Sequence, residues 1–569
     1  MLTRLVVRNF KTLEDVDIEL GQNVVFIGPN NSGKTSALQA LALWQTGVRT
    51  WRLSPSDPQP KDLSWATINR RSLTHTPVRE VGLLWRNKLR MTQYRRQDDA
   101  FADMIPIQVL VEGQGGNGAW QFGVELFLSN PESLLCRPMR GDSLGASLPG
   151  LEIPEPVHWV KIAFLPPMSG LAAEEEELQP GRVDVLIGEG QTARVLRNLC
   201  LVVLERSSQD WEAIAERLRQ MFGVRVGLPQ RDPARGTVEL SYREGDLELD
   251  IASAGRGLQQ TLLLLAHMHA NPGATLLLDE PDAHLEVLRQ RQIYNVLTDT
   301  ARASGSQIIM ASHSEIILDE AADRDVVVAF VGKPHRINNQ AAQLKKALTE
   351  IGFEQYAQAL LRPGVLYLEG ATDLAMLRAF AERLQHPARD VLREPFAHYV
   401  GNQPKLASAH YYGLREAKPE LRAFALFDRR ETGLPTEFTI QAHCWRKREI
   451  ENYVSRRSVL LGFASGDPPI DLLAQAEADR RREAMEAALA EVEAAQQTLF
   501  GRDAWGDDVK ASEEVLPAVF RLFYKSLGLR NEMNKADFHE LVAYLEAAEI
   551  DPEVTGVLDR INAVLREPT

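Results

Sequence analysis

The pattern of apolar and polar positions along the 569-residue chain predicts alternating strands and helices. Residues 1–20 alternate apolar and charged side chains, which is typical of a half-buried strand. Continuous apolar runs at 23–27, 274–278 and 306–312 have the composition of strands that are buried on both faces of a parallel sheet. A helix-forming segment follows the first run at 36–44. The chain is therefore predicted to have an α/β fold.

A long insertion separates the first apolar run from the other two, and it contains two kinds of pattern. Alternation at 107–128 predicts strands, whereas 191–204 and 211–222 are helix-like. The acidic run 174–177 and the proline-rich stretches are predicted to be solvated loops. The basic run 70–96 indicates either a solvated face or a surface that contacts phosphates.

The pattern of strands and helices starts again in the C-terminal part of the chain. Residues 340–361 predict a helix that ends at an Arg-Pro-Gly turn, and a new buried strand begins at 365–368. A domain boundary is therefore expected near residue 362. A second apolar run at 423–427 predicts another strand, and the Ala- and Glu-rich stretch 474–500 predicts an exposed helix.

The composition is that of an ordinary soluble protein, with 44% hydrophobic and 25% charged residues. No apolar run approaches the ~20 residues that span a bilayer, and the first residues lack a secretion signal, so we expect a cytoplasmic protein without membrane contact. The three cysteines are scattered without CxxC spacing, which argues against a disulfide framework or a zinc site. The net charge of -14 repels nucleic acid, so a polynucleotide would need a local basic surface or metal ions.

A glycine-rich loop follows the first apolar run and leads directly into the first helix-forming segment. It reads Gly28-Pro-Asn-Asn-Ser-Gly-Lys-Thr35. Glycines let backbone N–H groups close around phosphates, Lys34 reaches the β and γ oxygens, and the Thr35 hydroxyl ligates Mg²⁺. The loop therefore predicts binding of ATP and Mg²⁺. The residues assigned to the nucleotide are Asn30, Asn31, Ser32, Gly33, Lys34, Thr35 and Ser36.

Three further segments fit the same chemistry. Asp279 and Glu280 end a buried strand, where doubly wound sheets bind ligands, so Asp279 is assigned to Mg²⁺ and Glu280 to the attacking water. Ser253 and Gly255 lie in a turn just before an apolar helix, and His313 ends the next strand, where it can sense the γ-phosphate. Taken alone, the turn indicates only a helix cap and the histidine an ordinary residue. Their order along the chain favours the functional interpretation.

Together these motifs resemble ABC-type ATPases, with phosphate loop, signature loop, Walker B acids and switch histidine in the family order. The segment Asp279-Glu-Pro-Asp-Ala-His-Leu285 is most similar to OLD-family and RecF-type ATPases. The resemblance implies that ATP binds between two heads, with Ser253 and Gly255 acting in trans, so we expect at least a homodimer. The expected boundaries are 1–165 for the N-terminal part of the head, 166–230 for a helical insertion suited to dimerisation, and 231–340 for the C-terminal part of the head.

Acidic residues also occupy strand ends in the C-terminal part. Glu369 follows the buried strand predicted at 365–368, and Asp373 lies four residues later at the start of a helix. Both carboxylates can therefore converge on one hard cation. This arrangement resembles the first motif of Toprim domains. It implies a linker helix at 341–362 and a Toprim-like Rossmannoid α/β nuclease domain at 363–569.

The remaining Toprim motifs are matched less completely. Asp428 ends the next strand, but Arg430 stands where the family has a second acid, and a cation there repels metal unless Glu431 or a later acid substitutes. Glu451 lies in a segment that resembles one adding carboxylates in OLD-like Toprim nucleases, and Lys535 matches their late lysine. Acids of this kind hold Mg²⁺ ions during phosphodiester hydrolysis, and a lysine stabilises the transition state.

The combined resemblance, to OLD-family proteins, the Gabija nuclease subunit and PARIS-type systems, implies an ATP-regulated, Mg²⁺-dependent endonuclease. It further implies DNA rather than RNA as the favoured substrate, Mn²⁺ as an alternative metal at the second site, and a role in anti-phage defence, with a separately encoded partner in some systems. The catalytic assignments are Glu280, His313, Glu369, Asp373, Asp428, Glu451 and Lys535. The metal assignments are Thr35, Asp279, Glu369, Asp373, Asp428, Glu431 and Glu451.

Three alternatives stay open. The first is an ATPase sensor or scaffold whose Toprim-like domain binds or releases a partner without cleavage. The second is a Toprim effector that cleaves tRNA or another RNA. The third, a RecF-like repair ATPase, explains residues 1–340 but leaves the second acid cluster without a purpose.

Overall fold

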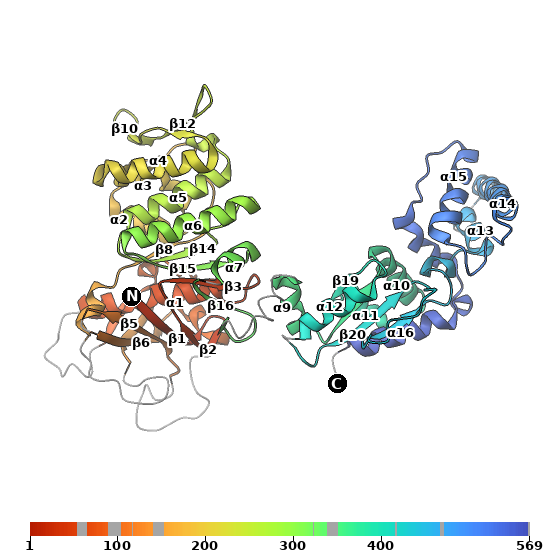
Figure 1. Ribbon diagram of the computed structural model, residues 1–569, viewed down its shortest axis with the longest axis horizontal. Helices are drawn as coiled ribbons and strands as arrows, with labels where there is room; N and C mark the ends of the chain where they lie inside the picture. The colour runs from red at the N-terminus through yellow and green to blue at the C-terminus, as the bar shows by residue number, and fades with distance from the viewer. Residues whose placement is uncertain are drawn as a thin grey trace. The chain divides into compact units, whose positions relative to one another are not determined.

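The computed structural model describes residues 1–53, 65–88, 104–116, 118–139, 153–322, 324–337, 351–415, 418–466 and 471–566. The chain divides into two compact units, Met1–Glu354 and Gln355–Thr569 (Figure 1). This division falls within the range predicted to be a linker, of which residues 341–350 lie outside the described residues. Part of the basic run 70–96, from residue 89 onward, also lies outside them.

A mostly parallel sheet forms the centre of the first unit. Its six strands are, in spatial order, β17 (His335–Arg336), β16 (Val326–Ala329), β3 (Asn23–Ile27), β15 (Gln307–Ser312), β14 (Thr275–Asp279) and β8 (Ile162–Leu165). Only β17 runs antiparallel to its neighbour. β3, β14 and β15 are buried at every position, which explains why they are continuous apolar runs in the sequence.

An antiparallel sheet packs on the other side of the first helix. Its strands are, in spatial order, β2 (Leu13–Glu19), β1 (Leu2–Phe10), β5 (Ile107–Gly115), β6 (Gly118–Asn130), β7 (Ser133–Pro138) and β4 (Ala66–Asn69). Helix α1 (Lys34–Leu53) lies between the two sheets and contacts strands of both (Figure 1). The buried indole of Trp44 donates a hydrogen bond to the Phe122 carbonyl at 2.8 Å. Because α1 begins just after β3, this packing fixes the loop between them at the sheet edge.

Helices of the first unit gather beyond the parallel sheet (Figure 1). They are α2 (Pro180–Gly188), α3 (Leu196–Arg206), α4 (Ser208–Phe222), α5 (Arg256–Ala270), α6 (Val287–Ser304) and α7 (Glu315–Ala321). Short strands lie between α4 and α5, namely β9 (Arg225–Val226), β10 (Gln230–Asp232), β11 (Thr237–Glu239), β12 (Ser241–Glu244) and β13 (Leu247–Asp250). The prediction that residues 174–177 form a solvated loop is wrong at Glu175. This side chain is 2% exposed, because its carboxylate accepts hydrogen bonds from the backbone N–H groups of Arg197 and Asn198.

The second unit is built on a four-stranded sheet. Its strands, all parallel, are in spatial order β19 (Ala397–Tyr399), β18 (Gly364–Leu368), β20 (Arg422–Phe427) and β21 (Gln441–Cys444). The connecting helices are α10 (Ala371–Arg383), α11 (Ala388–Arg393) and α12 (Pro404–Arg415). Both units therefore confirm the predicted α/β class, and the carboxyl ends of β18 and β20 are direct neighbours.

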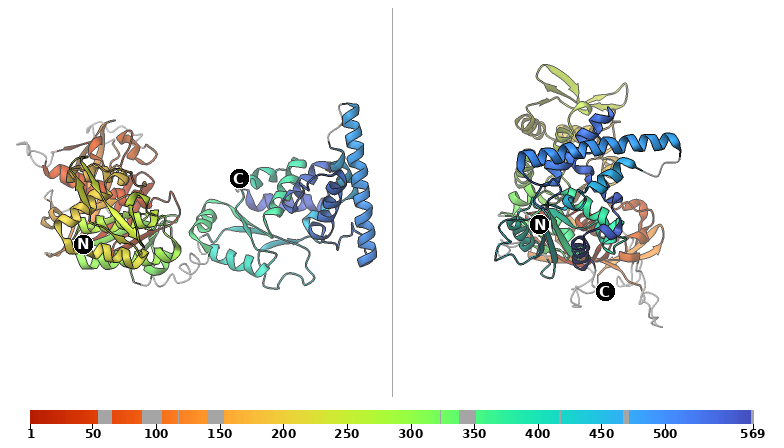
Figure 2. Two further views of the ribbon diagram at one scale, coloured as in Figure 1. Left: turned by 90° about the horizontal axis from the view of Figure 1, so that it is seen from above. Right: turned by 90° about the vertical axis from the view of Figure 1, so that its right-hand side faces the viewer.

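A helical region follows this sheet. It contains η9 (Ile450–Tyr453), α13 (Arg457–Ser465), α14 (Leu472–Phe500), η10 (Ala511–Val515), α15 (Leu516–Leu527), η11 (Lys535–Tyr544) and α16 (Pro552–Leu565), while α9 (Phe353–Leu361) precedes β18. Figure 2 shows α14 as one long helix along the second unit. As predicted it is widely exposed, but Met485, Leu489 and Val492 are buried in the core of this unit.

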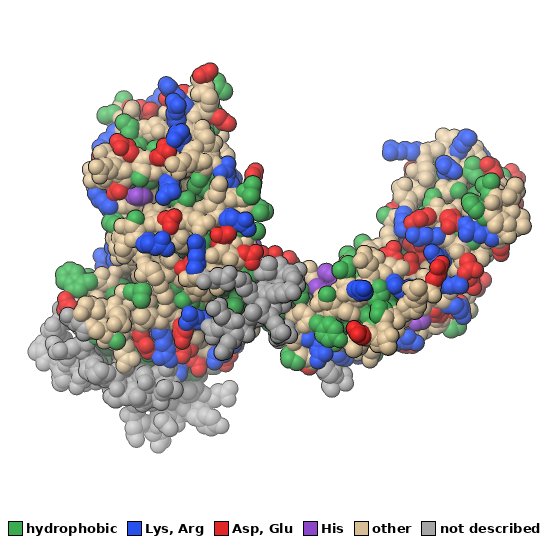
Figure 3. All heavy atoms as spheres, in the orientation of Figure 1, with side chains coloured by type: hydrophobic (Ala, Val, Ile, Leu, Met, Phe, Trp, Pro, Cys, Tyr) green, Lys and Arg blue, Asp and Glu red, His purple; other side chains and the backbone are tan. Residues whose placement is uncertain are grey.

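The surface carries both signs of charge. On the face seen in Figure 3, acidic and basic side chains are interspersed over both units. In the described part of the chain, no helix has the length and apolar character needed to cross a membrane.

Candidate nucleotide and metal sites

The loop between β3 and α1 is folded around its own lysine. Lys34 Nζ donates hydrogen bonds to the carbonyl oxygens of Gly28 and Pro29, each at 2.7 Å. Burial lowers the pKa of Lys34, and the nearby carboxylates of Glu280 and Asp279 oppose that shift. At Gly33, φ is +103°, and a Cβ atom would lie 2.9 Å from Thr12 Oγ1. Only glycine fits there.

The other predicted nucleotide residues lie around this loop. Asn30, Asn31 and Thr35 are exposed, whereas the Ser36 hydroxyl accepts a hydrogen bond from Thr12 at 3.4 Å. The Ser32 hydroxyl is buried and has no hydrogen-bond partner among the described residues. An unpartnered buried hydroxyl is unfavourable, so a phosphate oxygen is a suitable partner for it. The loop thus fits a bound nucleotide.

Thr35 and Asp279 meet although they are far apart in the sequence. The Thr35 hydroxyl lies 3.0 and 2.9 Å from the two carboxylate oxygens of Asp279. Burial raises the pKa of Asp279 to about 6, against the opposing hydrogen bond from Thr35. A hydroxyl and a buried carboxylate are the hard oxygen ligands that Mg²⁺ prefers. These two residues would hold the ion beside the loop.

Glu280 and His313 face each other at the same sheet edge. His313 Nδ1 lies 3.8 Å from Glu280 Oε1, and the two side chains are 51% and 35% exposed. Glu280 has a positive φ of 51°, a costly conformation for a residue with a side chain. Its backbone N–H donates to the Ala311 carbonyl at 2.9 Å, which ties it to the end of β15. The pair is therefore open to a ligand from the solvent side.

The predicted signature residues lie at the start of α5. Gly255 is the N-cap of this helix, and a Cβ atom built on it would meet nothing within 4 Å. Ser253 is exposed and belongs to η7 (Ile251–Ser253), whose N-cap Asp250 accepts a hydrogen bond from the Ala252 N–H at 2.7 Å. This turn is open to contact by a second molecule.

A second group of acids lies at the carboxyl edge of the sheet in the C-terminal unit. Glu369 follows β18, Asp428 follows β20, and their carboxyl groups are close enough to share a hydrogen bond. Asp373 lies in the first turn of α10 and accepts a hydrogen bond from the Gly370 N–H at 2.8 Å. The parallel sheet order therefore brings together three predicted residues.

Two further acids approach from the segment after β21. Glu451 is 3% exposed, and Glu449, also 3% exposed, accepts hydrogen bonds from the Ser512 N–H and hydroxyl. Lys535, at the start of η11, acts electrostatically on both acids and on Asp373. We name this group the acid cluster, and it comprises Glu369, Asp373, Asp428, Glu449 and Glu451.

Burial and mutual repulsion disfavour the charged form of these acids. Burial, followed by Glu369, raises the pKa of Asp428 to about 9. Burial, followed by Glu449, raises the pKa of Glu451 to about 8, and burial raises that of Asp373 to about 6. Within the described residues, however, no three Asp, Glu, His or Cys side chains are arranged to hold a metal ion. The donor chemistry fits a hard cation, but the carboxylates would have to move closer together to bind one.

Glu431 and Arg430, at which the sequence departs from the expected acid pattern, make contacts with residues outside the acid cluster. Glu431 does not reach it, because its side chain is 91% exposed and lies 4.0 Å from Arg448, and it is not a suitable metal ligand here. The guanidinium of Arg430 donates to the Asn402 carbonyl at 2.8 Å. The sequence prediction had also omitted Glu449 and Lys510, both of which interact electrostatically with the cluster. The Glu-x-Glu spacing was the available signal for Glu449.

Comparisons with known proteins fit these sites. Residues 1–49 match the family model "AAA ATPase domain", and residues 177–319 match "AAA domain, putative AbiEii toxin, Type IV TA system". Both matches fall in the first unit, and together with the phosphate loop and the strand-end acids they support ATPase activity for it.

One relative is the OLD nuclease of Thermus scotoductus, 28% identical over 361 residues, which are 58% of this chain and 64% of that protein. The match thus spans slightly less than two thirds of that relative. It confirms the predicted resemblance to OLD-family proteins. The ribose import ATP-binding protein RbsA of Chromobacterium violaceum is 34% identical over 128 residues, or 22% of this chain and 25% of that protein.

Solved structures with some likeness are heads of SMC proteins. One is an SMC head bound to the C-terminal winged-helix domain of ScpA, with a TM-score of 0.35 and 12% identity over 60% of this chain and 98% of that one. Another is the SMC head domain from Thermotoga maritima, with a TM-score of 0.32 and 13% identity over 59% of this chain and 99% of that one.

Proposed function

We propose that the chain is an ATP-hydrolysing, metal-dependent nuclease of the OLD kind, in which the first unit regulates the second. The observation that carries the nuclease half is the contact between Glu369 and Asp428, with Asp373 beside them, at the carboxyl edge of a parallel sheet. Ligands bind at this edge in open α/β sheets. The relative named above, an OLD nuclease, supports the same activity.

In the ATPase half, Lys34 contacts the β- and γ-phosphates, and Thr35 with Asp279 holds Mg²⁺. Glu280 orients the attacking water, and His313 contacts the γ-phosphate from the neighbouring strand. Ser253 and Gly255 of one copy cap the phosphate loop of a second copy, so the active form is a homodimer. The exposure of this turn supports that arrangement.

In the nuclease half, Glu369, Asp373, Asp428 and Glu451 hold one or two divalent cations, Mg²⁺ or Mn²⁺. Such ions supply a water of lowered pKa and neutralise the leaving oxygen. Glu449 accepts hydrogen bonds from Ser512 and adds a buried carboxyl to the acid cluster, while Lys535 stabilises charge on the phosphate in the transition state. The guanidinium of Arg430 donates a hydrogen bond to the Asn402 carbonyl, which fixes its position but leaves its positive charge in place.

The wider assignments follow from the resemblance. Residues 1–165 and 231–340 form the ATPase head, 166–230 serve dimerisation, 341–362 link the units, and 363–569 form the Toprim-like nuclease domain. The substrate is nucleic acid, with DNA favoured over RNA, and the biological role is defence against phage in the cytoplasm, with or without a separately encoded partner.

The test uses purified full-length chain with supercoiled DNA, linear DNA and total tRNA, in Mg²⁺ or Mn²⁺, with and without ATP. Glu369→Ala is expected to abolish cleavage while ATP hydrolysis persists. Glu431→Ala is the matched control, because the same change is made on an exposed side chain outside the cluster. No cleavage by the wild type under any condition, or full cleavage by Glu369→Ala, would refute the nuclease assignment.

A second candidate is an ATPase sensor that uses the C-terminal unit to hold or release a partner. It is favoured by the absence, among the described residues, of three side chains placed to bind a metal ion. Protection of cells from phage separates the two candidates. A sensor keeps its protection after Glu369→Ala, whereas a nuclease loses it.

A further inference from the structure

One arginine of the first unit is almost completely buried. Arg197, in α3, is 1% exposed and is among the largest fully buried side chains of the described residues. Arg and Lys are almost never fully buried unless they are paired, because removing a charge from water is costly. The burial of Arg197 in the helical part of the first unit therefore requires partners that offset the cost of removing its charge from water.

The first partners of Arg197 come from the stretch that follows β8. Its guanidinium donates to the carbonyl oxygens of Ala172 and Ala173 at 3.0 and 3.2 Å, and the buried Glu175 carboxylate lies 3.9 Å away. β8 pairs with β14 in register Leu165↔Leu278, one residue before Asp279. The stretch that Arg197 holds thus starts beside the metal-binding strand of the ATPase.

The remaining partner of Arg197 belongs to the signature turn. Arg197 Nη2 donates to Asp250 Oδ1 at 2.8 Å, and the same oxygen accepts the Ala252 N–H at 2.7 Å. Asp250 is the N-cap of η7, which leads directly to Ser253 and Gly255. One buried guanidinium therefore connects the stretch after β8 with the residue that fixes the start of the signature turn.

We propose that Arg197 is a positioning residue for the signature turn, which it holds at a fixed place relative to the strand that carries Asp279. This inference rests on the proposed ATPase function. The turn must meet a phosphate loop of a second copy, so a small displacement weakens that contact without altering nucleotide binding inside one head. Arginine suits the role because its planar fork donates to several oxygens at once, which a lysine ammonium on a flexible stem does not reproduce.

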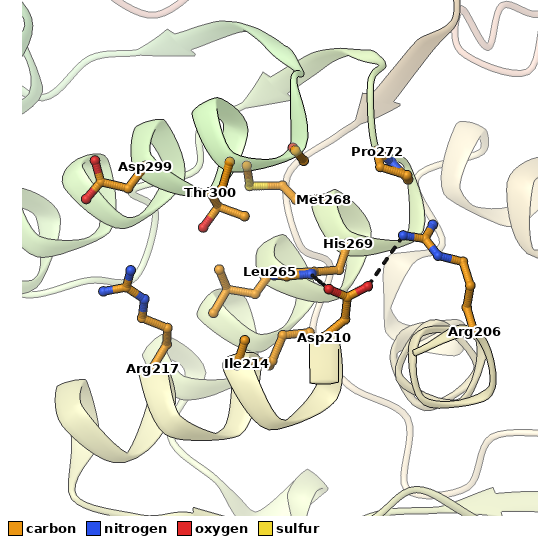
Figure 4. Close-up of a pocket in the computed structure, with 13 residues that line it drawn as sticks. Arg206, Asp210, Ile214, Arg217, Leu265, Met268, His269, Pro272, Asp299 and Thr300 are labelled. Atoms are coloured by element: carbon orange, nitrogen blue, oxygen red, sulfur yellow. Dashed lines mark hydrogen bonds and ion pairs between the residues drawn. The ribbon is translucent and has the colours of Figure 1, made fainter. Parts of the chain in front are cut away.

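The variants separate the charge from the helix cap. Asp250→Asn keeps a side-chain oxygen for the Ala252 N–H but removes the charge that pairs with Arg197. Asp250 is 49% exposed, so this change leaves no buried carboxylate without a partner. Arg197→Lys keeps the buried charge and loses the fork. Arg302→Ala is the control, because Arg302 lies in α6 outside residues 166–230, is 74% exposed and pairs at 3.3 Å with Asp299, which lines a separate pocket (Figure 4).

Three measurements are made on the full-length chain: binding of a fluorescent ATP analogue, ATP-dependent dimerisation in a Glu280→Gln background, and hydrogen exchange of the backbone amides at 251–259. For Asp250→Asn and Arg197→Lys we expect ATP affinity within twofold of wild type and dimerisation weakened about tenfold. That factor is 1.4 kcal/mol, close to the worth of one hydrogen bond to a charged group. In both variants exchange should rise at 251–259; in Arg197→Lys it should also rise around 172–175, where Arg197 contacts the carbonyl oxygens of Ala172 and Ala173, and it should stay unchanged elsewhere in the unit.

The outcomes distinguish this inference from the proposed function. If neither wild type nor Arg302→Ala dimerises with ATP, the dimeric ATPase proposal fails, and amide exchange at 251–259 still decides the role of Arg197. Unchanged exchange and dimerisation in both variants would overturn the inference. A rise in exchange across the whole unit in Asp250→Asn would also overturn it, since Arg197 would then stabilise the fold in general.

Discussion

The acid cluster should destabilise the C-terminal unit when no divalent cation is bound, and removing one charge should make the protein more stable. The pKa of Asp428 is raised by burial and then by Glu369 to about 9, from an ordinary value of 3.8. A carboxyl whose pKa is higher in the folded state favours folding at low pH, and this contribution is lost as the pH rises from about 4 toward 9. At pH 7 the loss is roughly 1.36 × 3.2, or about 4 kcal/mol.

The change Glu369→Gln removes the largest charge acting on Asp428 and leaves an amide that can donate to its carboxylate. If the pKa of Asp428 falls by about 1.5 units, to about 7.5, the free energy of unfolding at pH 8 rises by about 0.8 kcal/mol, because the wild-type carboxyl is still mostly protonated at that pH. For a unit of this size, about 2–4 °C of melting temperature corresponds to each kcal/mol, so we expect an increase of about 2–3 °C at pH 8.

Scanning calorimetry of the full-length chain in a chelator, between pH 5 and 9, measures this effect. The melting temperature of the wild type should fall with rising pH, and Glu369→Gln should flatten the fall. The charged groups that face Asp428 are Glu369, Asp373 and Glu449. Lys510 and Lys535 attract the acids next to Asp428 and so partly offset the repulsion among them. Glu431→Gln is the control and should change nothing, because Glu431 is 91% exposed. A melting temperature at pH 8 that is unchanged or lowered in Glu369→Gln would refute the reasoning.

Three further predictions concern the two sites. Asp279→Asn should lower the rate of ATP hydrolysis, measured by phosphate release, by about 10²–10³-fold, which is the usual effect of losing one charge-stabilising group at a reaction centre. If the variant retains more than a tenth of the wild-type activity, the role of Asp279 is contradicted. Gly33→Ala should abolish binding of a fluorescent ATP analogue, since the added Cβ would lie 2.9 Å from Thr12 Oγ1 at a φ of +103°; wild-type affinity would show that the loop does not need this glycine. Binding of Mn²⁺ to the acid cluster should release protons and tighten between pH 6 and 9, because the raised pKa values of Asp428 and Glu451 leave protons for the cation to displace. Calorimetric titration in two buffers of different ionisation enthalpy measures that release, and a pH-independent affinity would speak against it.

The nucleotide site was predictable because most of its residues are contiguous. A loop from Gly28 to Thr35 carries glycines, lysine and hydroxyl in one short segment, so local sequence determines the geometry. The meeting of Thr35 with Asp279 depends instead on strand order. Thr35 follows β3 and Asp279 ends β14, and β15 lies between these two strands. This order could not be predicted, because an apolar run in the sequence does not show which strands will be its neighbours in the sheet.

The acid cluster was predictable only in part, because its members come from separate elements. Glu369 and Asp428 follow strands that are adjacent in the sheet, and the pattern of apolar residues located both strand ends. Glu449 was omitted because its side chain turns inward from a segment with no regular period, where the sequence does not indicate a facing direction. The prediction for Glu175 failed for a related reason. Four consecutive glutamates suggest a solvated loop, but two backbone N–H groups of α3 donate hydrogen bonds to the Glu175 carboxylate and so offset the cost of burying it.

The two sites share a layout, with carboxylates at the carboxyl ends of parallel strands next to the first turn of a helix, but they differ in how charge is balanced. At Asp279, burial and Glu280 raise the pKa, while the Thr35 hydroxyl and Lys34 lower it. At Asp428, burial and the three neighbouring acids Glu369, Asp373 and Glu449 all raise the pKa. The first site carries its own cation and hydrogen-bond donor, so it is preorganised. In the proposed nuclease, the second site would gain compensation for its central acids when a divalent cation binds, so cation binding would be the step that brings the carboxylates together. Such a site is suited to regulation, because an event that separates the carboxylates would remove the metal and with it the capacity to cleave.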